Sequence, residues 1–185
     1  RKTNPFMIYS GQELGEKGMD TEGFSGRDGR TSIFDYWSMD SIRKWRNGGK
    51  FDGKKITPEQ QHLLDFYRLL LTLSTHEKAI SCGQFFDLMY ANQNGWKFNE
   101  HKQYTFLRKY KNELLLIVVN FDCVAVEVAI NLPSHAFDYL QMPQTEGYEA
   151  TDLLTNKKEI ISLLPYKATE TSLAAHGAKI LKIIF

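Results

Sequence analysis

The pattern of apolar and polar positions divides the chain into two parts. Residues 1–80 combine short apolar runs with long polar segments, and they include one extended helical pattern. Residues 81–185 instead place apolar side chains at every second position in a series of short runs. Such alternation indicates β-strands that bury one face. The sequence therefore predicts two domains, 1–80 and 81–185.

The first domain opens with a short and nearly continuous apolar run. Phe-Met-Ile-Tyr at 6–9 follows Pro5, and a run of this kind is typical of a strand buried on both faces, as in a parallel sheet covered by helices. A long loop rich in glycine and charge follows at 11–30. Loops of this length in compact domains are usually functional or mobile. We therefore expect a strand that ends at a functional loop.

Two helices are predicted after this loop. The first covers 39–47, with Ser38 as its candidate N-cap and a Gly-Gly stop signal at its end. The second begins at Thr57, because Thr57-Pro58-Glu59-Gln60 combines a capping box with proline at the first helical position. Apolar side chains then cover most of the helix circumference, so both of its sides need cover from other parts of the structure. They are Leu63, Leu64, Phe66, Tyr67, Leu69, Leu70, Leu71 and Leu73.

The second domain contains a series of predicted strands. They lie at 83–90, 104–110, 113–121, 124–132, 148–153, 159–163, 173–175 and 178–185. Turn residues such as Asn94-Gly95 and Lys111-Asn112 separate neighbouring strands. Many short strands at close spacing predict an antiparallel β-sandwich. The whole chain is thus expected to be mainly β.

Composition and charge narrow the possible partners. The chain has 185 residues, 42% of them hydrophobic, and a formal net charge of +1. A charge so near zero argues against binding to nucleic acid or to an anionic membrane surface, and the longest apolar runs are too short to span a bilayer. The first residue is not methionine, so targeting stays unassigned and both cytoplasm and periplasm remain open.

The two cysteines, Cys82 and Cys123, have neither the spacing of a disulfide framework nor that of a zinc site. Buried free thiols are expected, and a bridge between them is the alternative. The histidines also lack a metal-ligand spacing. No cofactor or metal is predicted for this chain.

Four segments resemble, in order, parts of the α-amylase family (glycoside hydrolase family 13). NPFMIYSGQELGE at 4–16 resembles the eighth barrel strand and its turn, and GFSGRDGRTSIFDYW at 23–37 resembles the following loop of one bacterial branch. TPEQQHLLDFYRLLLTLSTHEKAISCGQF at 57–85 is similar to the last barrel helix and its run into the C-terminal sandwich, called domain C. YTFLRKYKNELLLIVVNF at 104–121 is similar to paired strands of that domain. The likeness fades after about Pro133.

The resemblance implies the C-terminal fragment of a retaining glycoside hydrolase that acts on α-glucans such as starch or maltodextrin. Residues 1–80 would be the last β/α unit of a truncated (β/α)8 barrel, and 81–185 would be the sandwich. In this family the two carboxylates that act on the bond lie about 5 Å apart, and a third acidic residue assists them. All three belong to barrel strands that would precede Arg1, so no catalytic residue is assigned here, and any calcium site would also depend on that part.

Residues after the predicted strand would line one wall of the cleft. Gln12 and Glu13 could hydrogen-bond sugar hydroxyls or hold neighbouring loops. Phe24, Tyr36 and Trp37 could stack on glucose rings or fasten the loop to the barrel. The expected partners are the missing barrel portion and, through the parent enzyme, an α-glucan substrate. Neither nucleic acid nor a membrane is expected.

Trp96 is a further candidate, beside a predicted hairpin turn. It could serve as a sugar platform, or it could pack across its own hairpin. Two other functions remain open for the chain. It could be a starch-binding β-sandwich module, which requires an exposed pair of aromatic side chains, or a purely structural domain.

Overall fold

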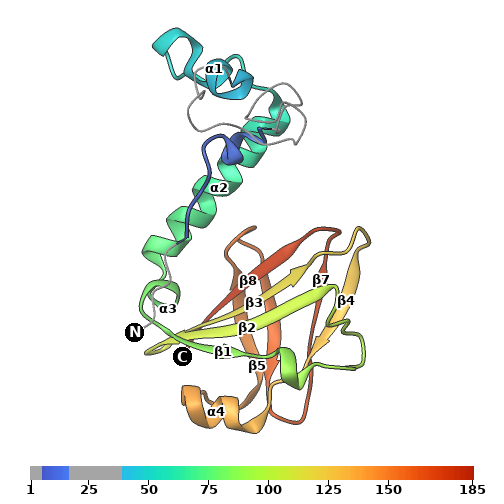
Figure 1. Ribbon diagram of the computed structural model, residues 1–185. Coiled ribbons are helices and arrows are strands. Elements are labelled where there is room, and N and C mark those ends of the chain that lie inside the picture. The colour runs from blue at the N-terminus through green and yellow to red at the C-terminus, as the bar shows by residue number, and fades with distance from the viewer. Residues whose placement is uncertain (1–5, 17–38) are drawn as a thin grey trace. The chain divides into compact units, whose positions relative to one another are not determined.

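A computed structural model of the protein describes residues 6–16 and 39–185 (Figure 1). The chain forms two compact units, with the first ending at Thr72 and the second beginning at Leu73. This division falls within helix α2, Pro58–His76. The last turn of α2 therefore belongs to the second unit.

The first unit is helical in its described part. It contains η1 (Gln12–Leu14), α1 (Asp40–Arg46), η3 (Asn47–Gly49) and most of α2. Helix α1 occupies the predicted position, but its N-cap is Met39, and Ser38 lies outside the described residues. The capping box of α2 is formed as predicted. The N–H of Gln60 donates to Oγ1 of Thr57 over 3.2 Å, and the N–H of Thr57 donates to Oε1 of Gln60 over 3.0 Å.

The strand predicted at the start of the chain is not formed among the described residues. Phe6 to Tyr9 have no strand pairing, and both Phe6 and Met7 are exposed, Met7 to 80%. A strand is held by hydrogen bonds to a neighbouring strand. The described part of the first unit contains no other strand with which this run could pair.

Helix α2 is less covered than its apolar pattern predicts. Leu64 and Leu73 are buried, but Phe66 and Leu71 are exposed. A helix that is apolar around most of its circumference normally lies between two covering layers. In this structure α2 retains apolar side chains in contact with solvent.

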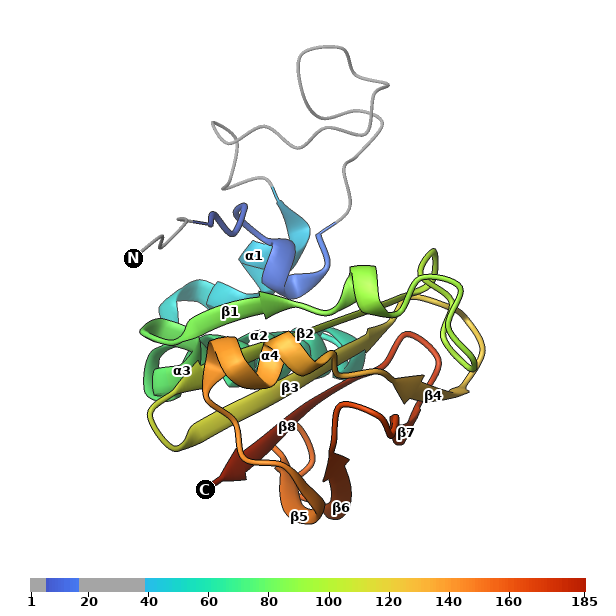
Figure 2. The ribbon, with the colours of Figure 1, turned by 90° about the horizontal axis from the view of Figure 1, so that it is seen from below.

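The second unit is built mainly of antiparallel strands (Figures 1 and 2). A six-stranded sheet has the order β1-β2-β3-β8-β5-β6, and a two-stranded sheet pairs β4 with β7. Every pairing between these strands is antiparallel. The strands are β1 (Gln84–Asp87), β2 (Gln103–Tyr110), β3 (Glu113–Asn120), β4 (Val126–Ile130), β5 (Thr145–Asp152), β6 (Lys158–Leu163), β7 (Thr169–Leu173) and β8 (Ala178–Ile184).

Short helices complete the second unit. They are α3 (Lys78–Ser81), η4 (Met89–Ala91) and α4 (Ser134–Leu140). The pattern of the sequence did not predict α4, which lies between two strand regions and turns its buried side toward the core. Helix α4 lies near β1 at one edge of the larger sheet.

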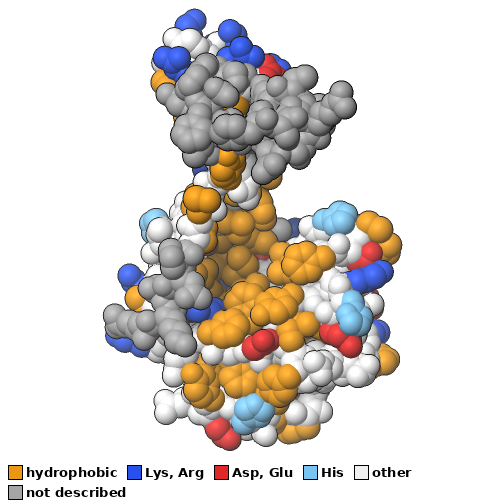
Figure 3. Space-filling model, in the orientation of Figure 1, with side chains coloured by type: hydrophobic (Ala, Val, Ile, Leu, Met, Phe, Trp, Pro, Cys, Tyr) orange, Lys and Arg blue, Asp and Glu red, His pale blue; other side chains and the backbone are white. Residues whose placement is uncertain are grey.

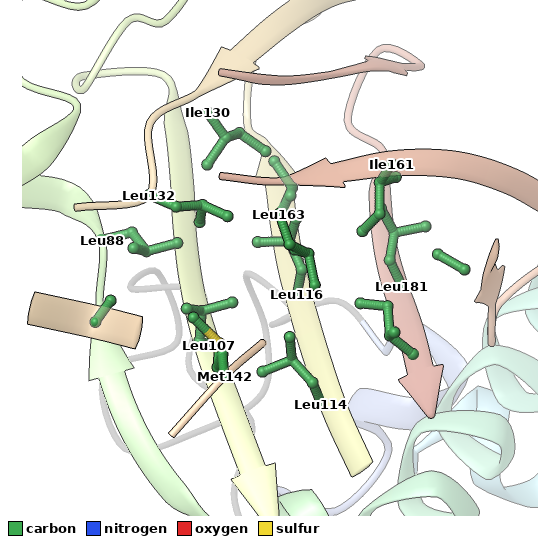
Figure 4. Close-up of a cluster of buried hydrophobic side chains, with 14 of the residues drawn as sticks. Leu88, Leu107, Leu114, Leu116, Ile130, Leu132, Met142, Ile161, Leu163 and Leu181 are labelled. Atoms are coloured by element: carbon green, nitrogen blue, oxygen red, sulfur yellow. The ribbon is translucent and has the colours of Figure 1, made fainter. Parts of the chain in front are cut away.

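One hydrophobic core joins both sheets and α4 (Figure 4). Leu107, Leu116 and Leu181 come from central strands of the larger sheet, while Ile130 comes from β4 in the smaller one, and all four are fully buried. Because the two sheets share this core, the unit has the layered packing of a sandwich. The predicted antiparallel, mainly β fold is confirmed for this unit.

The cysteines differ from expectation in one respect. Cys82 and Cys123 are free, but both are exposed rather than buried. Cys82 caps the C-terminus of α3, and Cys123 lies in the connection between β3 and β4. Connecting segments lie on protein surfaces because their backbone polar groups need solvent, which outweighs the preference of a thiol for burial.

Candidate functional site

The segment at 6–16 folds into a tight turn that depends on Gly11. This glycine has a φ of 87°, in the left-handed region that side chains disfavour. A Cβ at this position would lie 2.9 Å from the Cβ of Glu16 and 3.1 Å from Cε of Met39. The N–H groups of Leu14 and Glu16 both donate to the carbonyl oxygen of Gly11. Conformation and space therefore both require glycine here.

Gln12, a candidate for either a sugar contact or a loop support at the rim of the cleft, is hydrogen-bonded to helix α2. Its Nε2 donates to the hydroxyl of Tyr67 over 2.8 Å, and its Oε1 accepts from the N–H of Tyr9 over 3.2 Å. Gln60 adds a second link, because its Nε2 donates to the carbonyl of Leu14 over 3.1 Å. These contacts hold the turn against α2 and orient the Gln12 amide.

Glu16 links the turn to α1. Its carboxylate accepts hydrogen bonds from both the N–H and the hydroxyl of Ser41, with the N–H at 3.1 Å. Ser41 is buried in the first turn of α1. A carboxylate near the N-terminus of a helix is favoured by the helix dipole. Glu16 thus connects the turn to the first turn of α1.

A cavity of about 300 Å³ lies beside the turn. Its described lining consists of Ile8, Tyr9, Ser10, Glu13, Leu64, Tyr67, Arg68 and Leu71. Glu13 is the one carboxylate in this lining, and Arg68 is the one positively charged side chain. A retaining glycosidase needs two carboxylates facing the scissile bond. This cavity can hold polar groups against an apolar wall, but its described lining does not provide that pair.

The other predicted rim contacts, Phe24, Tyr36 and Trp37, lie outside the described residues. Among the residues that are described, no group of three or more His, Cys, Asp or Glu side chains could hold a metal ion. The described helices also include none with the length and apolar character needed to cross a membrane.

Trp96 lies in the connection between η4 and β2 and is 67% exposed. Most of its indole is therefore not covered by packing across its hairpin. Nζ of Lys97 lies 4.5 Å from the ring centroid and 3.3–3.4 Å from carboxylate oxygens of Glu170 and Glu127. The hydrogen bond to Glu170, aided by Glu127, raises the pKa of Lys97. Trp96 is therefore an exposed indole beside the ammonium group of Lys97, which the two carboxylates hold in place.

The sequence pattern does not identify Tyr67 as the partner of Gln12. The two residues are 55 positions apart, and the helical pattern places Tyr67 among the apolar side chains of α2. Its hydroxyl gave the one available signal, because a tyrosine in an apolar row needs a hydrogen-bond partner when it is covered.

Comparison of the structure with solved structures finds related folds. AmyP in complex with maltose matches with a TM-score of 0.57 and 19% identity, over 98% of this chain and 32% of that one. A noncanonic maltogenic α-amylase, AmyB from Thermotoga neapolitana, matches with a TM-score of 0.52 and 12% identity, over 71% of this chain and 28% of that one. The chain thus spans about a third or less of either protein. No protein-family model matches the sequence, and no curated protein is significantly similar to it.

At these identities the likeness is one of fold. It extends over nearly the whole chain in AmyP and therefore includes both units. The expectation of a mainly antiparallel β fold that matches part of an α-amylase-family enzyme is confirmed.

Proposed function

We propose that this chain is the C-terminal portion of an α-amylase-family glycoside hydrolase acting on α-glucans such as starch or maltodextrin. The observation that carries the proposal is the fold likeness to AmyP, a protein crystallised with maltose, over 98% of the chain. Four collinear sequence segments point to the same family. The bond-cleaving carboxylates would belong to the part of the enzyme that precedes this chain.

The apolar surface of the first unit supports the proposal. Phe6, Met7, Phe66 and Leu71 are all exposed, whereas monomeric soluble proteins rarely leave large apolar surfaces in contact with water. In a complete barrel, the segment at 6–9 would pair with neighbouring strands, and α2 would lie against the outside of the sheet. The preceding portion of the enzyme would supply both kinds of cover.

In this proposal, the turn at 11–16 forms part of the cleft wall. Active sites of such barrels lie at the C-terminal ends of the strands, and this turn directly follows the segment assigned as the last strand. Gln12 is oriented by Tyr67, and Glu13 lines the adjacent cavity. We assign these two side chains to one wall of the cleft, where they support the loops and contact sugar hydroxyls. The second unit stabilises the barrel.

The coding sequence upstream of Arg1 and the activity of the full-length protein test this proposal. We expect acidic residues at the ends of three preceding strands, and hydrolysis of starch by the full-length protein. The 185-residue chain alone should not hydrolyse p-nitrophenyl maltooligosaccharides. Turnover by this chain that Glu13→Gln or Glu16→Gln abolishes would overturn the assignment of catalysis to the missing part.

A further inference from the structure

Four aromatic rings meet at the edge of the six-stranded sheet. Phe86 of β1 is central, with its ring centroid 5.3 Å from that of His135, 5.9 Å from that of Tyr139 and 6.3 Å from that of Tyr90. The rings of Tyr90 and His135 are 5.5 Å apart, and the Tyr90 hydroxyl hydrogen-bonds with Nε2 of His135. We call these four side chains the aromatic surface.

Three separate elements build the aromatic surface. His135 and Tyr139 are four positions apart on α4, so they share one face of this helix, while its other face is buried. Phe86 pairs with Leu107 and therefore points to the core side of the sheet, but β1 is an edge strand and leaves Phe86 only half-buried. Tyr90 comes from η4, directly after β1. All these elements belong to the second unit.

The outer rings of the aromatic surface are open to solvent. Tyr90 is 49% exposed, Tyr139 is 54% exposed, and His135 is exposed as well. Hydrophobic side chains gather on this side of the second unit, around β1 (Figure 3). The position of Phe86 is explained by closure of the core at the sheet edge, where the other three rings contact its side chain. Closure of the core does not explain why Tyr90 and Tyr139 leave about half of their surface in contact with water.

The two segments that carry the aromatic surface include acidic residues but no lysine or arginine. Asp87 and Asp138 are both exposed and lie next in sequence to members of the surface. Segments 84–91 and 132–141 contain neither lysine nor arginine. Burial, together with the charge of Asp87, raises the pKa of Tyr90, and a tyrosine hydroxyl is protonated at neutral pH even without such a shift. The surface therefore offers apolar ring faces, hydroxyl and imidazole groups, and carboxylate acceptors.

We infer that the aromatic surface binds neutral α-glucan chains. A glucose ring has C–H groups on its faces and hydroxyls around its rim, which complements aromatic faces bordered by hydrogen-bonding groups. The two carboxylates and the absence of basic residues in 84–91 and 132–141 disfavour anionic ligands such as nucleic acid or acidic lipid. The ligand class rests on the proposed function. The position of the site goes beyond the proposed function, because it places a polymer contact on the second unit, to which the proposed function assigns no chemistry.

Such a site would keep the parent enzyme on its polymer. A second contact on the same molecule raises the effective concentration of substrate for the cleft, without changing the cleft itself. Loss of the aromatic surface should therefore weaken action on starch granules more than action on short maltooligosaccharides.

Affinity electrophoresis of the 185-residue chain in native gels with and without amylopectin tests the inference. Amylopectin should retard the unsubstituted chain. The double variant Tyr90→Ala/Tyr139→Ala should lose most of this retardation, and its Kd for maltoheptaose by calorimetry should rise at least about tenfold. Tyr166→Ala is the matched control, since Tyr166 is 80% exposed in the turn between β6 and β7; it should bind as the unsubstituted chain does.

A second double variant separates stacking from loss of structure. Tyr90→Phe/Tyr139→Phe keeps both rings, so its Kd should change less than about threefold, and circular dichroism verifies that each variant is folded. The inference is overturned if amylopectin does not retard the unsubstituted chain, or if the alanine pair binds normally. It is also overturned if Trp96→Ala alone abolishes binding, or if light scattering finds a dimer that the alanine pair dissociates.

Failure of this inference can be distinguished from failure of the proposed function. Starch hydrolysis by the full-length protein, combined with no binding by this chain, would remove the aromatic surface as a glucan site and keep the family assignment. Binding at this surface, combined with a full-length protein that lacks hydrolysis, would do the reverse.

Discussion

Lys182 on β8 forms an ion pair with Glu77, a residue 105 positions earlier that connects α2 to α3. The same ammonium group lies 3.5 Å from the carboxylate of Glu113 on β3, and Glu113 also accepts a hydrogen bond from the N–H of Ala79 over 2.7 Å. The side chains of Lys182, Glu77 and Glu113 are only 12–25% exposed. They therefore fasten α3 to the larger sheet.

Replacing Lys182 by methionine should destabilise the second unit. Two poorly solvated carboxylates would remain without their shared cation, which we expect to lower the free energy of unfolding by about 2–3 kcal/mol. Lys158→Met is the matched control, because Lys158 and Glu149 form an ion pair with both side chains exposed, and exposed pairs contribute less than about 1 kcal/mol. Urea unfolding of both variants measures the difference. Equal losses would contradict a special role for Lys182.

The same ion pairs predict a loss of stability at high pH. Burial lowers the pKa of Lys182, but hydrogen bonds and charges from Glu77 and Glu113 outweigh this effect, so that the net pKa is raised above 10.5. A raised lysine pKa contributes stability that is complete below 10.5 and is lost as the pH rises through the folded-state value. Stability of the unsubstituted chain should fall toward that of Lys182→Met in this range.

The ion pair between Asp122 and Lys102 predicts instead a loss of stability at low pH. Lys102 donates to its carboxylate over 2.7 Å, and this hydrogen bond lowers the pKa of Asp122 below its ordinary value of 3.8. A lowered carboxyl pKa contributes stability above 3.8 that is lost as the pH falls through the folded-state value. Asp122→Asn should therefore be less stable than the unsubstituted chain at pH 7, and the gap should narrow in acid. Thermal unfolding across this range tests the sign, and a gap that widens in acid would refute it.

Apolar periodicity predicted most of the second unit because its strands bury alternate side chains. In β2, buried and half-buried positions alternate from Gln103 to Leu107, which a period of two reveals directly. The rule missed most of β7 because its inward positions include Thr169 and Thr171, which are buried. The Thr171 hydroxyl donates to Glu159 over 3.0 Å. A hydroxyl that is satisfied inside the structure looks like a surface residue in the sequence.

A local sequence pattern cannot reveal features that bring distant segments together. Phe6 to Tyr9 have the composition of a buried strand, but a strand exists only through its neighbours. The aromatic surface joins Tyr90 to His135, which are 45 positions apart, and α4 was not predicted at all. The rim candidates Gln12 and Glu13 came from the resemblance to a family, because neither residue type identifies a site by itself.

Gly11→Ala should destabilise the turn at 11–16 more than an ordinary glycine replacement would. The added Cβ meets Glu16 and Met39 at about 3 Å, in addition to the unfavourable φ, so we expect a cost of about 2–3 kcal/mol. Gly48→Ala isolates the conformational part of this cost, because Gly48 has a φ of 66° but no atom within 4 Å of the added Cβ; it should cost about 1 kcal/mol. Hydrogen exchange of peptides from the first unit measures both, and equal effects would show that the contacts relax freely.

Lys111→Gly should stabilise the hairpin between β2 and β3. Lys111 has a φ of 54°, a left-handed conformation that costs a residue with a Cβ about 1 kcal/mol and costs glycine little. The Nζ of Lys109 donates to the carbonyl of Lys111, and this backbone acceptor is kept in the variant. We expect the free energy of unfolding to rise by about 0.5 kcal/mol, since glycine also gains entropy in the unfolded chain.

The neighbouring residue supplies the control for the hairpin. Asn112 is not among the described residues with positive φ, so Asn112→Gly gains nothing from relief of backbone strain and should lower the free energy of unfolding by about 0.5 kcal/mol. Opposite signs at two adjacent positions, measured by urea unfolding, would show that backbone conformation and not loss of a side chain governs this turn. A loss of stability in both variants would instead assign the effect to the Lys111 ammonium group, which lies 5.5 Å from the ring centroid of Tyr110.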